Sequence, residues 1–329
     1  MKVYRDKDAD ESVLKGKTVA VIGYGIQGSA QALCLRDSGV DVVVGARSNG
    51  NSWMRALKDG MEVMEIDKAA REGDIVCMLT PDMTQKDIYE KSVRASMSEG
   101  KTLYFSHGFN IVFNLIKPPA NVDVIMLAPK GPGAKLREAY ANGWGIPALL
   151  AIHQDYTGRA RETALGLAKA MGFTKPGVFE SAFEQETVCD LFGEQAVLCG
   201  GSAELVKAGF DTLVDAGFPP EVAYFECLYE LKLITDLIQE GGIEYMWKRV
   251  SETARYGGLT RGKRVIDERV RANMREILRE IKDGRFAREL TGEYAGGLKK
   301  MDAMVKAERD EQIEKVGAEI REKFEFRKK

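Results

Sequence analysis

Four carboxylates in the second half of the chain have a spacing that could hold a divalent cation. Asp190 and Glu194 lie four residues apart in ETVCDLFGEQAVLCGG, and Glu226 and Glu230 repeat this spacing in AYFECLYELKLITDLI. On a helix, residues four apart share one face, where two like charges repel each other. Each pair is a candidate metal site, because a bound cation would remove this repulsion.

The helix faces that carry these pairs continue as apolar residues. Val197 follows the first pair, and Leu233 and Leu237 follow the second. Carboxylates on an apolar stripe carry a desolvation cost, which a bound cation offsets. Mg²⁺ prefers a few carboxylates together with water and substrate oxygens. The pattern favours a magnesium site, and the alternative is two accidental acidic pairs on exposed helices.

A glycine-rich turn near the start of the chain has the spacing of a phosphate-binding loop. The string Gly23-Tyr24-Gly25-Ile26-Gln27-Gly28 fits GxGxxG between the β-branched run KTVAVI and a helix-like stretch. Its glycines allow a tight turn and close backbone approach, and the helix N-terminus then faces a pyrophosphate. A bare GxGxxG also occurs without a ligand, but the strand before it and the helix after it favour dinucleotide binding.

The end of the next predicted strand indicates which dinucleotide this turn would bind. An NAD site usually has an acidic residue there, which holds the ribose 2′-hydroxyl. This chain has GARSNGNS at 45–52, where Arg47 is accompanied by Ser48 and Ser52. A cation among hydroxyls suits a 2′-phosphate. The loop favours NADPH, and a solvated loop arginine is the alternative.

The chain contains two histidines, and both are candidates for a role in catalysis. His107 follows a predicted strand directly, in YFSHGFN, at the edge where open α/β sheets collect their ligands. His153 likewise follows an apolar strand, so position alone does not separate the two.

The elements that must position these groups predict an α/β fold with two domains. Up to about residue 180, apolar runs alternate with helical patterns, which predicts a mostly parallel, Rossmann-type sheet with helices on both faces. The predicted strands are 17–22, 41–47, 74–79, 101–106, 122–127 and 146–152. From Phe183 onward only helical patterns follow, and the charged final stretch predicts a solvated terminal helix with a frayed end. We expect a dinucleotide-binding domain at 1–182 and an all-helical metal- and substrate-binding domain at 183–329.

Composition restricts the partners of the protein. The 48 basic and 50 acidic residues give a net charge of −2, which offers no reason to expect nucleic acid or an anionic membrane surface. No run reaches the roughly 18 apolar residues of a membrane-spanning helix, and the N-terminus lacks a signal-peptide core. The five cysteines are scattered without metal-binding spacing. We expect a cytoplasmic protein that acts on a small molecule.

Taken together, these residues resemble the short form of ketol-acid reductoisomerase, also called acetohydroxyacid isomeroreductase. The strings that carry the resemblance are GYGIQGSAQALCLRDSGVDVVVG, TPDMTQ, FSHGFNI, APKGPG, DLFGEQAVLCGG, ECLYELKLITDLIQEGG and SETARYG. The resemblance implies a Mg²⁺-dependent alkyl migration in 2-acetolactate or 2-aceto-2-hydroxybutyrate, coupled to reduction by NAD(P)H. The product would be a 2,3-dihydroxy acid of valine and isoleucine biosynthesis, the branched-chain amino acid pathway.

The resemblance also implies roles for individual residues. The dinucleotide would contact the glycine turn (Gly23 to Gly28), Arg47, Ser48, Ser52, Asp82, Met83, Thr84, Gln85 and Gly133. His107 would be the active-site histidine, and Lys130 would line the site. Asp190 would bridge two Mg²⁺ ions, Glu194 would hold one of them, and Glu226 and Glu230 would hold the other. Glu230 or a metal-bound hydroxide would be the base, and Ser251 would bind the substrate carboxylate.

The family also implies a knotted helical domain and a homodimer or higher homo-oligomer, in which a partner subunit supplies Glu226, Glu230 and Ser251 to each active site. The chain departs from the family at Ile26, at Ser29 and at Gly50, which replaces a serine that often helps bind the 2′-phosphate. The sequence therefore predicts that NADH is also usable. Two alternatives are a metal-free β-hydroxyacid-type dehydrogenase and a non-catalytic NADP-sensing module, neither of which needs the paired carboxylates.

Overall fold

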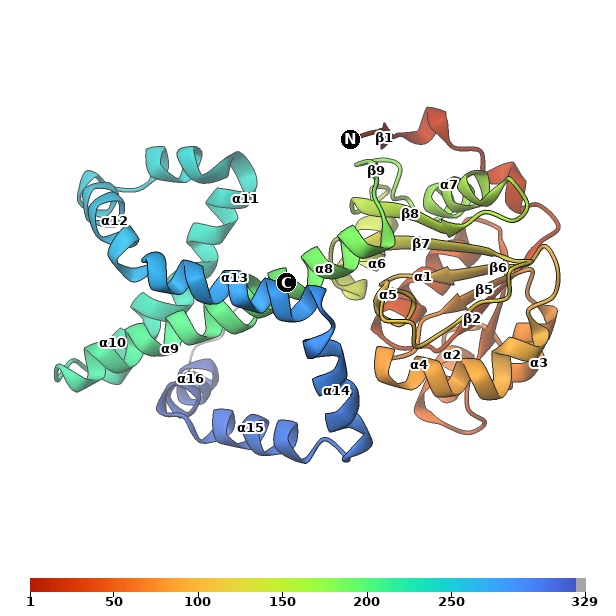
Figure 1. Cartoon of the computed structure of the whole chain (residues 1–329). Helices are drawn as coiled ribbons and strands as arrows, with labels where there is room; N and C mark the ends of the chain where they lie inside the picture. The colour runs from red at the N-terminus through yellow and green to blue at the C-terminus, as the bar shows by residue number, and fades with distance from the viewer. Residues whose placement is uncertain (324–329) are drawn as a thin grey trace. The chain divides into compact units, whose positions relative to one another are not determined.

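The computed structural model describes residues 1–323, and the chain divides into two compact units, Met1–Cys189 and Asp190–Lys329 (Figure 1). The division falls inside helix α8 (Phe183–Gly193). The predicted domain boundary at 182/183 lies directly before this helix and stays a prediction.

The first unit is built on a sheet in the order β1-β9-β8-β7-β6-β5-β2-β3-β4. Neighbouring strands are parallel except at β7–β8 and β1–β9, which are antiparallel. The mostly parallel, Rossmann-type sheet is thus confirmed. Its strands are β1 (Val3–Tyr4), β2 (Thr18–Ile22), β3 (Asp41–Gly45), β4 (Glu62–Met64), β5 (Ile75–Met78), β6 (Thr102–Phe105), β7 (Asp123–Pro129), β8 (Ala148–Gln154) and β9 (Val178–Glu180).

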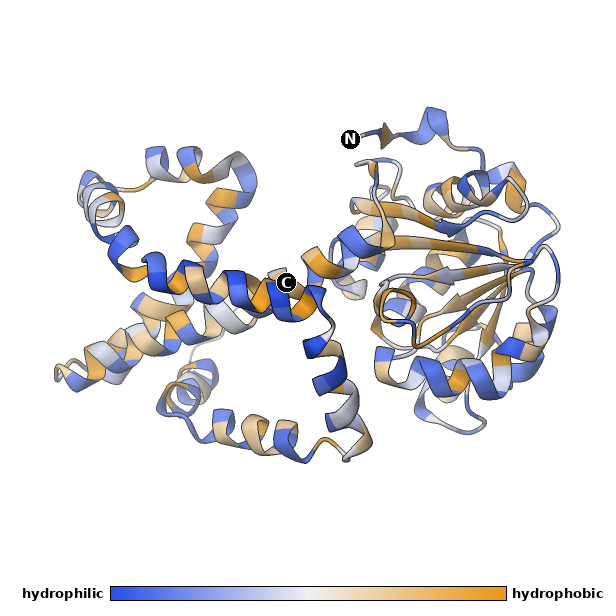
Figure 2. Cartoon of the chain, in the orientation of Figure 1, coloured by the Kyte–Doolittle hydropathy of each residue, from blue (hydrophilic) through white to orange (hydrophobic). Residues whose placement is uncertain are grey.

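Each strand sends alternate side chains to opposite faces of this sheet, and both faces are covered by helices. In β2, Val19 and Val21 belong to one buried cluster, and Ala20 and Ile22 belong to the other. The first cluster packs under α1 (Ile26–Asp37), α2 (Asn51–Lys58), α6 (Gly133–Ala141) and α7 (Ala160–Ala170). The second packs under α3 (Ile66–Glu72), the π-turn η3 (Tyr89–Val93) that follows α4 (Asp82–Ile88), and α5 (Phe109–Val112). The strands appear as the apolar centre of this unit in Figure 2.

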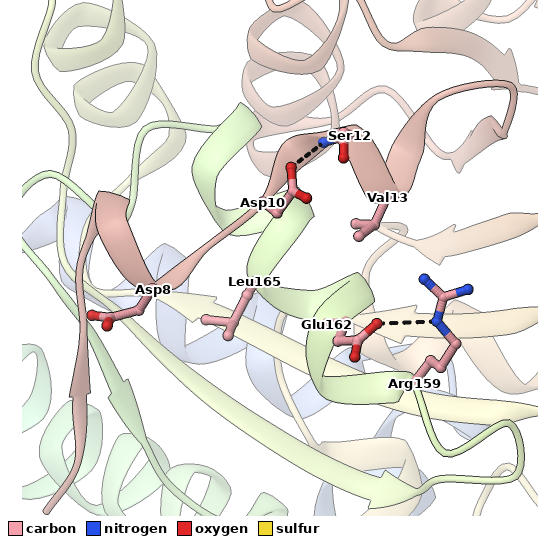
Figure 3. Close-up of a pocket in the computed structure, with 7 residues that line it drawn as sticks. All are labelled: Asp8, Asp10, Ser12, Val13, Arg159, Glu162 and Leu165. Atoms are coloured by element: carbon pink, nitrogen blue, oxygen red, sulfur yellow. Dashed lines mark hydrogen bonds and ion pairs between the residues drawn. The ribbon is translucent and has the colours of Figure 1, made fainter.

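A polar hollow of about 520 Å³ lies between α7 and the N-terminal segment that holds the short helices η1 (Asp6–Asp8) and η2 (Glu11–Leu14). Figure 3 shows Asp10 bonded to Ser12, and Arg159 paired with Glu162. Thr157, just before α7, bonds to Asp123 at the start of β7. The start of α7 therefore lies at the amino edge of the parallel strands, opposite the edge where α/β sheets bind ligands.

The second unit is helical throughout its described part, residues 190–323, as predicted. After α8 come the π-turn η5 (Glu194–Leu198), α9 (Gly200–Asp215), α10 (Pro220–Tyr224), the π-turn η6 (Phe225–Tyr229), α11 (Glu230–Arg249), α12 (Glu252–Val265), α13 (Glu268–Lys282), α14 (Arg285–Ala295), α15 (Lys299–Asp310) and α16 (Gln312–Lys323). No helix in the described part of the chain is both long and apolar enough to cross a bilayer.

The final helix corrects one prediction. We expected the charged C-terminal stretch to be solvated, and α15 indeed buries none of its residues. Helix α16, however, buries Ile313, Gly317 and Ile320, and Gly317 lies against Tyr224 of α10. These three residues form a stripe at helical spacing that the surrounding charges obscure in the sequence. The predicted frayed end, at 324–329, lies outside the described residues.

Candidate active site

The glycine turn after β2 has the shape that close approach of a phosphate requires. Gly23 has a φ of +97°, which favours glycine, and a Cβ there would lie 2.7 Å from Thr80 Cγ2. A Cβ on Gly28 would lie 2.2 Å from the Gly23 carbonyl oxygen. At Gly25, in contrast, a Cβ would meet no described atom within 4 Å. The first and last glycines close the turn, and the middle one leaves its outer side open.

Helix α1 begins at this opening and presents its N-terminus there. Its N-cap is Gly25, and no side chain of the described residues caps it. The first N–H groups of a helix lack partners within the helix, and together with its dipole they bind phosphate. The open glycine and the uncapped helix therefore fit the pyrophosphate of a dinucleotide.

Tyr24, a predicted cofactor contact, places its side chain in the buried core of the first unit. It is fully buried, and its hydroxyl donates to Asp59 Oδ2 at 3.0 Å. Burial, together with the Asp59 carboxylate, raises the pKa of Tyr24, so the phenol stays protonated. The ring and hydroxyl of Tyr24 are thus held inside the unit, and its contact with a cofactor stays a prediction.

The loop after β7 packs directly on the glycine turn. A Cβ on Gly133 would lie 2.1 Å from the Ile26 carbonyl oxygen, so only glycine allows α6 to approach α1 this closely. Gln27 Nε2 donates to the Gly131 carbonyl at 3.1 Å. Gly133 thus acts on the turn by permitting this packing.

Another predicted cofactor segment, Asp82 to Gln85, begins α4. The Gln85 side chain is buried, and its Nε2 donates to the Thr80 carbonyl at 2.9 Å. Asn110 Nδ2 donates in turn to Gln85 Oε1 at 3.1 Å. Gln85 therefore holds the loop in place, whereas Asp82, Met83 and Thr84 are half-buried at its surface.

The loop after β3 carries the residues predicted to choose between NADPH and NADH. Arg47 and Ser48 are exposed, and Ser52 is half-buried in α2. The Gly50 N–H donates to the Arg47 carbonyl at 3.0 Å, and a Cβ on Gly50 would lie 3.1 Å from that oxygen. A serine at this position would therefore require the turn to shift slightly.

His107 and Lys130 come together on a third residue, Glu186 of α8. Lys130 Nζ lies 2.9 Å from Glu186 Oε1, and His107 Nδ1 lies 3.1 Å from Glu186 Oε2. The Glu186 side chain is only 1% exposed. The close packing of α8 depends on Gly108, where a Cβ would lie 2.2 Å from Thr187 Oγ1.

The charge of Glu186 determines which His107 nitrogen carries a proton. Burial alone would raise the pKa of Glu186, but the contacts with His107 and Lys130 lower it below its usual value. An ionised carboxylate can only accept hydrogen bonds. His107 Nδ1 therefore donates, and Nε2 is the unprotonated ring nitrogen whenever the imidazole is neutral.

Glu186 is a candidate site residue that the sequence pattern did not single out. It lies four residues before Asp190, so Glu186, Asp190 and Glu194 form one series at helical spacing. The half-buried Asp190 follows Glu186 on the same face of α8, one turn further along. A search for triplets instead of pairs would have found it.

The other three candidate metal ligands lie at π-turns, where we expected regular α-helix. Glu194 begins η5, Glu226 lies in η6, and Glu230 follows η6 directly. Such turns insert a residue into a helix and are frequent at functional sites. All three side chains are exposed in the single chain.

The apolar stripes beyond these carboxylates correct a second expectation. Val197 and Leu233 are each 51% exposed, so the stripes are not buried within one chain. Glu194, Glu226 and Glu230 therefore carry little of the desolvation cost that we inferred from the sequence, whereas the half-buried Asp190 carries more of it. Ser251, the predicted substrate-binding residue, is exposed at the N-cap of α12, where its Oγ accepts from the Ala254 N–H at 3.1 Å.

The fold and the glycine turn define the class of the protein: a dinucleotide-binding oxidoreductase with a Rossmann-type unit and a helical unit. Residues 13–177 match the family model described as the acetohydroxy acid isomeroreductase NADPH-binding domain, and residues 183–326 match the ketol-acid reductoisomerase C-terminal domain. The chain belongs to the ketol-acid reductoisomerase family. This membership selects the predicted reductoisomerase over the metal-free dehydrogenase and the NADP-sensing module.

Individual relatives agree with this membership. Ketol-acid reductoisomerase (NADP(+)) of Methanocaldococcus jannaschii is 53% identical, over 98% of this chain and 97% of the relative. The same enzyme of Pyrobaculum arsenaticum is 52% identical, over 97% of this chain and 98% of the relative. Among solved structures, an NADH-preferring ketol-acid reductoisomerase from an uncultured archaeon matches with a TM-score of 0.96 and 50% identity, over 99% of this chain and all of that one.

Proposed function

We propose that the chain converts 2-acetolactate and 2-aceto-2-hydroxybutyrate to 2,3-dihydroxy acids, with two Mg²⁺ ions and NADPH. The observation that carries the proposal is that both halves of the chain match the two domains of this one family. When bound, Mg²⁺ supplies Lewis-acid polarisation of the substrate oxygens, and the nicotinamide supplies the hydride. The open glycine turn and the carboxylate donor set fit these two groups.

Each candidate residue has a proposed task within this reaction. Asp190, Glu194, Glu226 and Glu230 offer the oxygen ligands that Mg²⁺ prefers. Glu186 holds Lys130 and His107, so that the ammonium donates a proton or hydrogen bond and His107 orders water. Glu230 is the candidate base. Ser251 and the N-terminus of α12 offer donors to the substrate carboxylate.

For the cofactor, we propose a moderate preference for NADPH, with NADH also used. Arg47 and Ser52 favour the 2′-phosphate, whereas Gly50 removes one hydroxyl donor. One lost hydrogen bond to a charged group changes affinity by about one to two decades, and by less in a loop where water replaces the donor. The NADH-preferring relative, together with relatives named for NADP(+), supports the use of either cofactor on this scaffold.

We further propose a homodimer or higher homo-oligomer with active sites shared between subunits. Glu194, Glu226, Glu230 and Ser251 are all exposed in the single chain. The same unit exposes large apolar side chains, among them Ile243 (62%) and Tyr256 (69%). Large apolar side chains that stay exposed are typical of a surface that a partner covers.

The proposal is tested by following NADPH consumption with 2-acetolactate, with and without Mg²⁺. The wild type should need both, and Asp190→Asn should lower turnover more than about a hundredfold. The control Asp236→Asn removes a carboxylate that is paired with Lys232 at the surface of α11, and should change turnover less than about twofold. Wild type that consumes no NADPH with either acetohydroxy acid would overturn the function. Turnover of Asp190→Asn within about tenfold of wild type would overturn the metal assignment.

A further inference from the structure

A carboxylate from the neighbouring strand reaches the loop that reads the ribose 2′ position. Strands β3 and β4 are parallel and end at the same level, with Gly45 opposite Met64. The Ala46 N–H donates to the Met64 carbonyl at 3.0 Å, which ties the loop to the end of β4. Glu65 follows Met64 directly, and Ser48 Oγ donates to Glu65 Oε1 at 3.3 Å.

Glu65 is charged and accessible at this position. Lys68, on the first turn of α3, places its Nζ 2.8 Å from Glu65 Oε2. This lysine, followed by the Ser48 hydroxyl, holds the pKa of Glu65 below its usual value. The Glu65 side chain is 50% exposed and that of Lys68 is 59% exposed, so both charges are accessible from solvent beside the loop.

We infer that Glu65 and Lys68 set the balance between NADH and NADPH. The inference rests on the proposed binding of the dinucleotide at this loop. An NAD site usually takes its acidic residue from the end of the second strand, where this chain has Ala46 and Arg47. Glu65 supplies the missing carboxylate from the adjacent strand. Its charge repels a 2′-phosphate, and Lys68 opposes that repulsion.

The two members of this ion pair should therefore act with opposite signs. Glu65→Gln leaves Lys68 and Arg47 unopposed, which favours the phosphate of NADPH. Lys68→Gln leaves Glu65 uncompensated, which favours NADH. Because both groups are half-exposed, we expect each variant to change the ratio of the two dissociation constants by about three- to tenfold. Both shifts should shrink as salt is raised.

The test is titration of the purified full-length protein with NADPH and NADH, followed by the fluorescence of the reduced nicotinamide, without Mg²⁺ or substrate. Wild type, Glu65→Gln, Lys68→Gln and the double variant are compared at low and high salt. The matched control is Glu162→Gln, whose pair with Arg159 has the same three-residue spacing and similar exposure on α7, at the opposite edge of the sheet. The control should keep the wild-type ratio, and the double variant should return close to it.

The ratios of the NADPH and NADH dissociation constants in Glu65→Gln and Lys68→Gln decide the outcome. Loss of folded protein lowers binding of both cofactors equally, so it cancels in the ratio of dissociation constants. Ratios that stay within about twofold of wild type, or that move in the same direction in both variants, overturn the role of this pair while leaving the proposed function intact. Wild type that binds neither dinucleotide overturns the proposed function, and the inference with it.

Discussion

Glu186 shows how one buried residue holds two candidate site residues in place. Its carboxylate contacts Lys130 and His107, which lie 56 and 79 residues away in sequence. A buried carboxylate is costly unless it is paired and hydrogen-bonded, and here each oxygen has a partner. The same pairing fixes the direction of the lysine and the tautomer of the histidine, so Glu186 acts through these residues as a positioning group.

We predict that Glu186→Gln destabilises the protein in a pH-dependent way. The lowered pKa of Glu186 means that its ion pairing stabilises the fold at pH values above the ordinary glutamate value of 4.5. This contribution is lost as the pH falls through the lowered folded-state pKa. At pH near 7 the variant should be less stable by about 1–3 kcal/mol, measured by urea denaturation. At a second, acidic pH below the lowered pKa of Glu186, the difference should close. An equal difference at both pH values would show that packing, and not charge, is responsible.

The surface residue Glu138 provides the control for this measurement. Its carboxylate pairs with Lys135, but both side chains are more than half exposed. Glu138→Gln should therefore change stability by less than about 1 kcal/mol at either pH.

The four-residue spacing in the sequence indicated the carboxylate pairs, but it did not indicate which residues from other elements lie near them. Asp190, Glu194, Glu226 and Glu230 stand out because like charges at four-residue spacing need an explanation. The contacts of Glu186 with His107 and Lys130 depend on how α8 packs on the segments that follow β6 and β7, which no local pattern encodes. Likewise, Tyr24 lies inside a fingerprint for cofactor binding, and only the structure shows its ring buried against Asp59.

At the scale of elements, sequence patterns predicted the strands and helices that are long enough to show a period. The six predicted strands are apolar runs that the structure contains as β2, β3, β5, β6, β7 and β8. The three missed strands, β1, β4 and β9, are only two or three residues long and too short to show a period. The π-turns η5 and η6 also went unpredicted, because no residue type marks the position where one residue is inserted into a helix.

The packing of α6 on α1 yields a prediction about cofactor binding. A Cβ on Gly133 would lie 2.1 Å from the backbone oxygen of Ile26, which cannot move without shifting the glycine turn. Gly133→Ala should therefore weaken NADPH binding by at least about tenfold in a fluorescence titration. In the control, Gly131→Ala, the nearest atom is the tip of the Ile146 side chain at 3.2 Å, which can rotate away. Equal affinities of the two variants would mean that this contact does not shape the turn.

At the scale of the whole molecule, the two units differ in how much of their apolar surface each one buries by itself. The sheet unit buries two large apolar clusters within itself. The helical unit has a small core around Phe210, Tyr224 and Ile313, and it exposes both apolar side chains and site carboxylates. Composition and periodicity predicted the two kinds of domain. They could not predict this difference, because it depends on which helix faces meet within one chain.

The proposed sharing of active sites predicts that two inactive variants restore each other. Suppose that each site takes Asp190 and Glu194 from one subunit, and Glu226 and Glu230 from its partner. In a random mixture of Asp190→Asn and Glu226→Gln subunits, half of the sites receive an intact Asp190, and half of those receive an intact Glu226. Co-expression of the two at equal levels should then give about a quarter of wild-type turnover.

The matched control mixes Asp190→Asn with Glu194→Gln. These residues lie four apart and would come from the same subunit, so every site in this mixture carries one defect and turnover should stay at the level of the single variants. Restoration by Glu226→Gln but not by Glu194→Gln would be specific to shared sites, because general stabilisation of the oligomer would act equally in both mixtures. If neither mixture regains turnover of 2-acetolactate, the four carboxylates are not divided between subunits in this way, and the exposed face of the helical unit has another role.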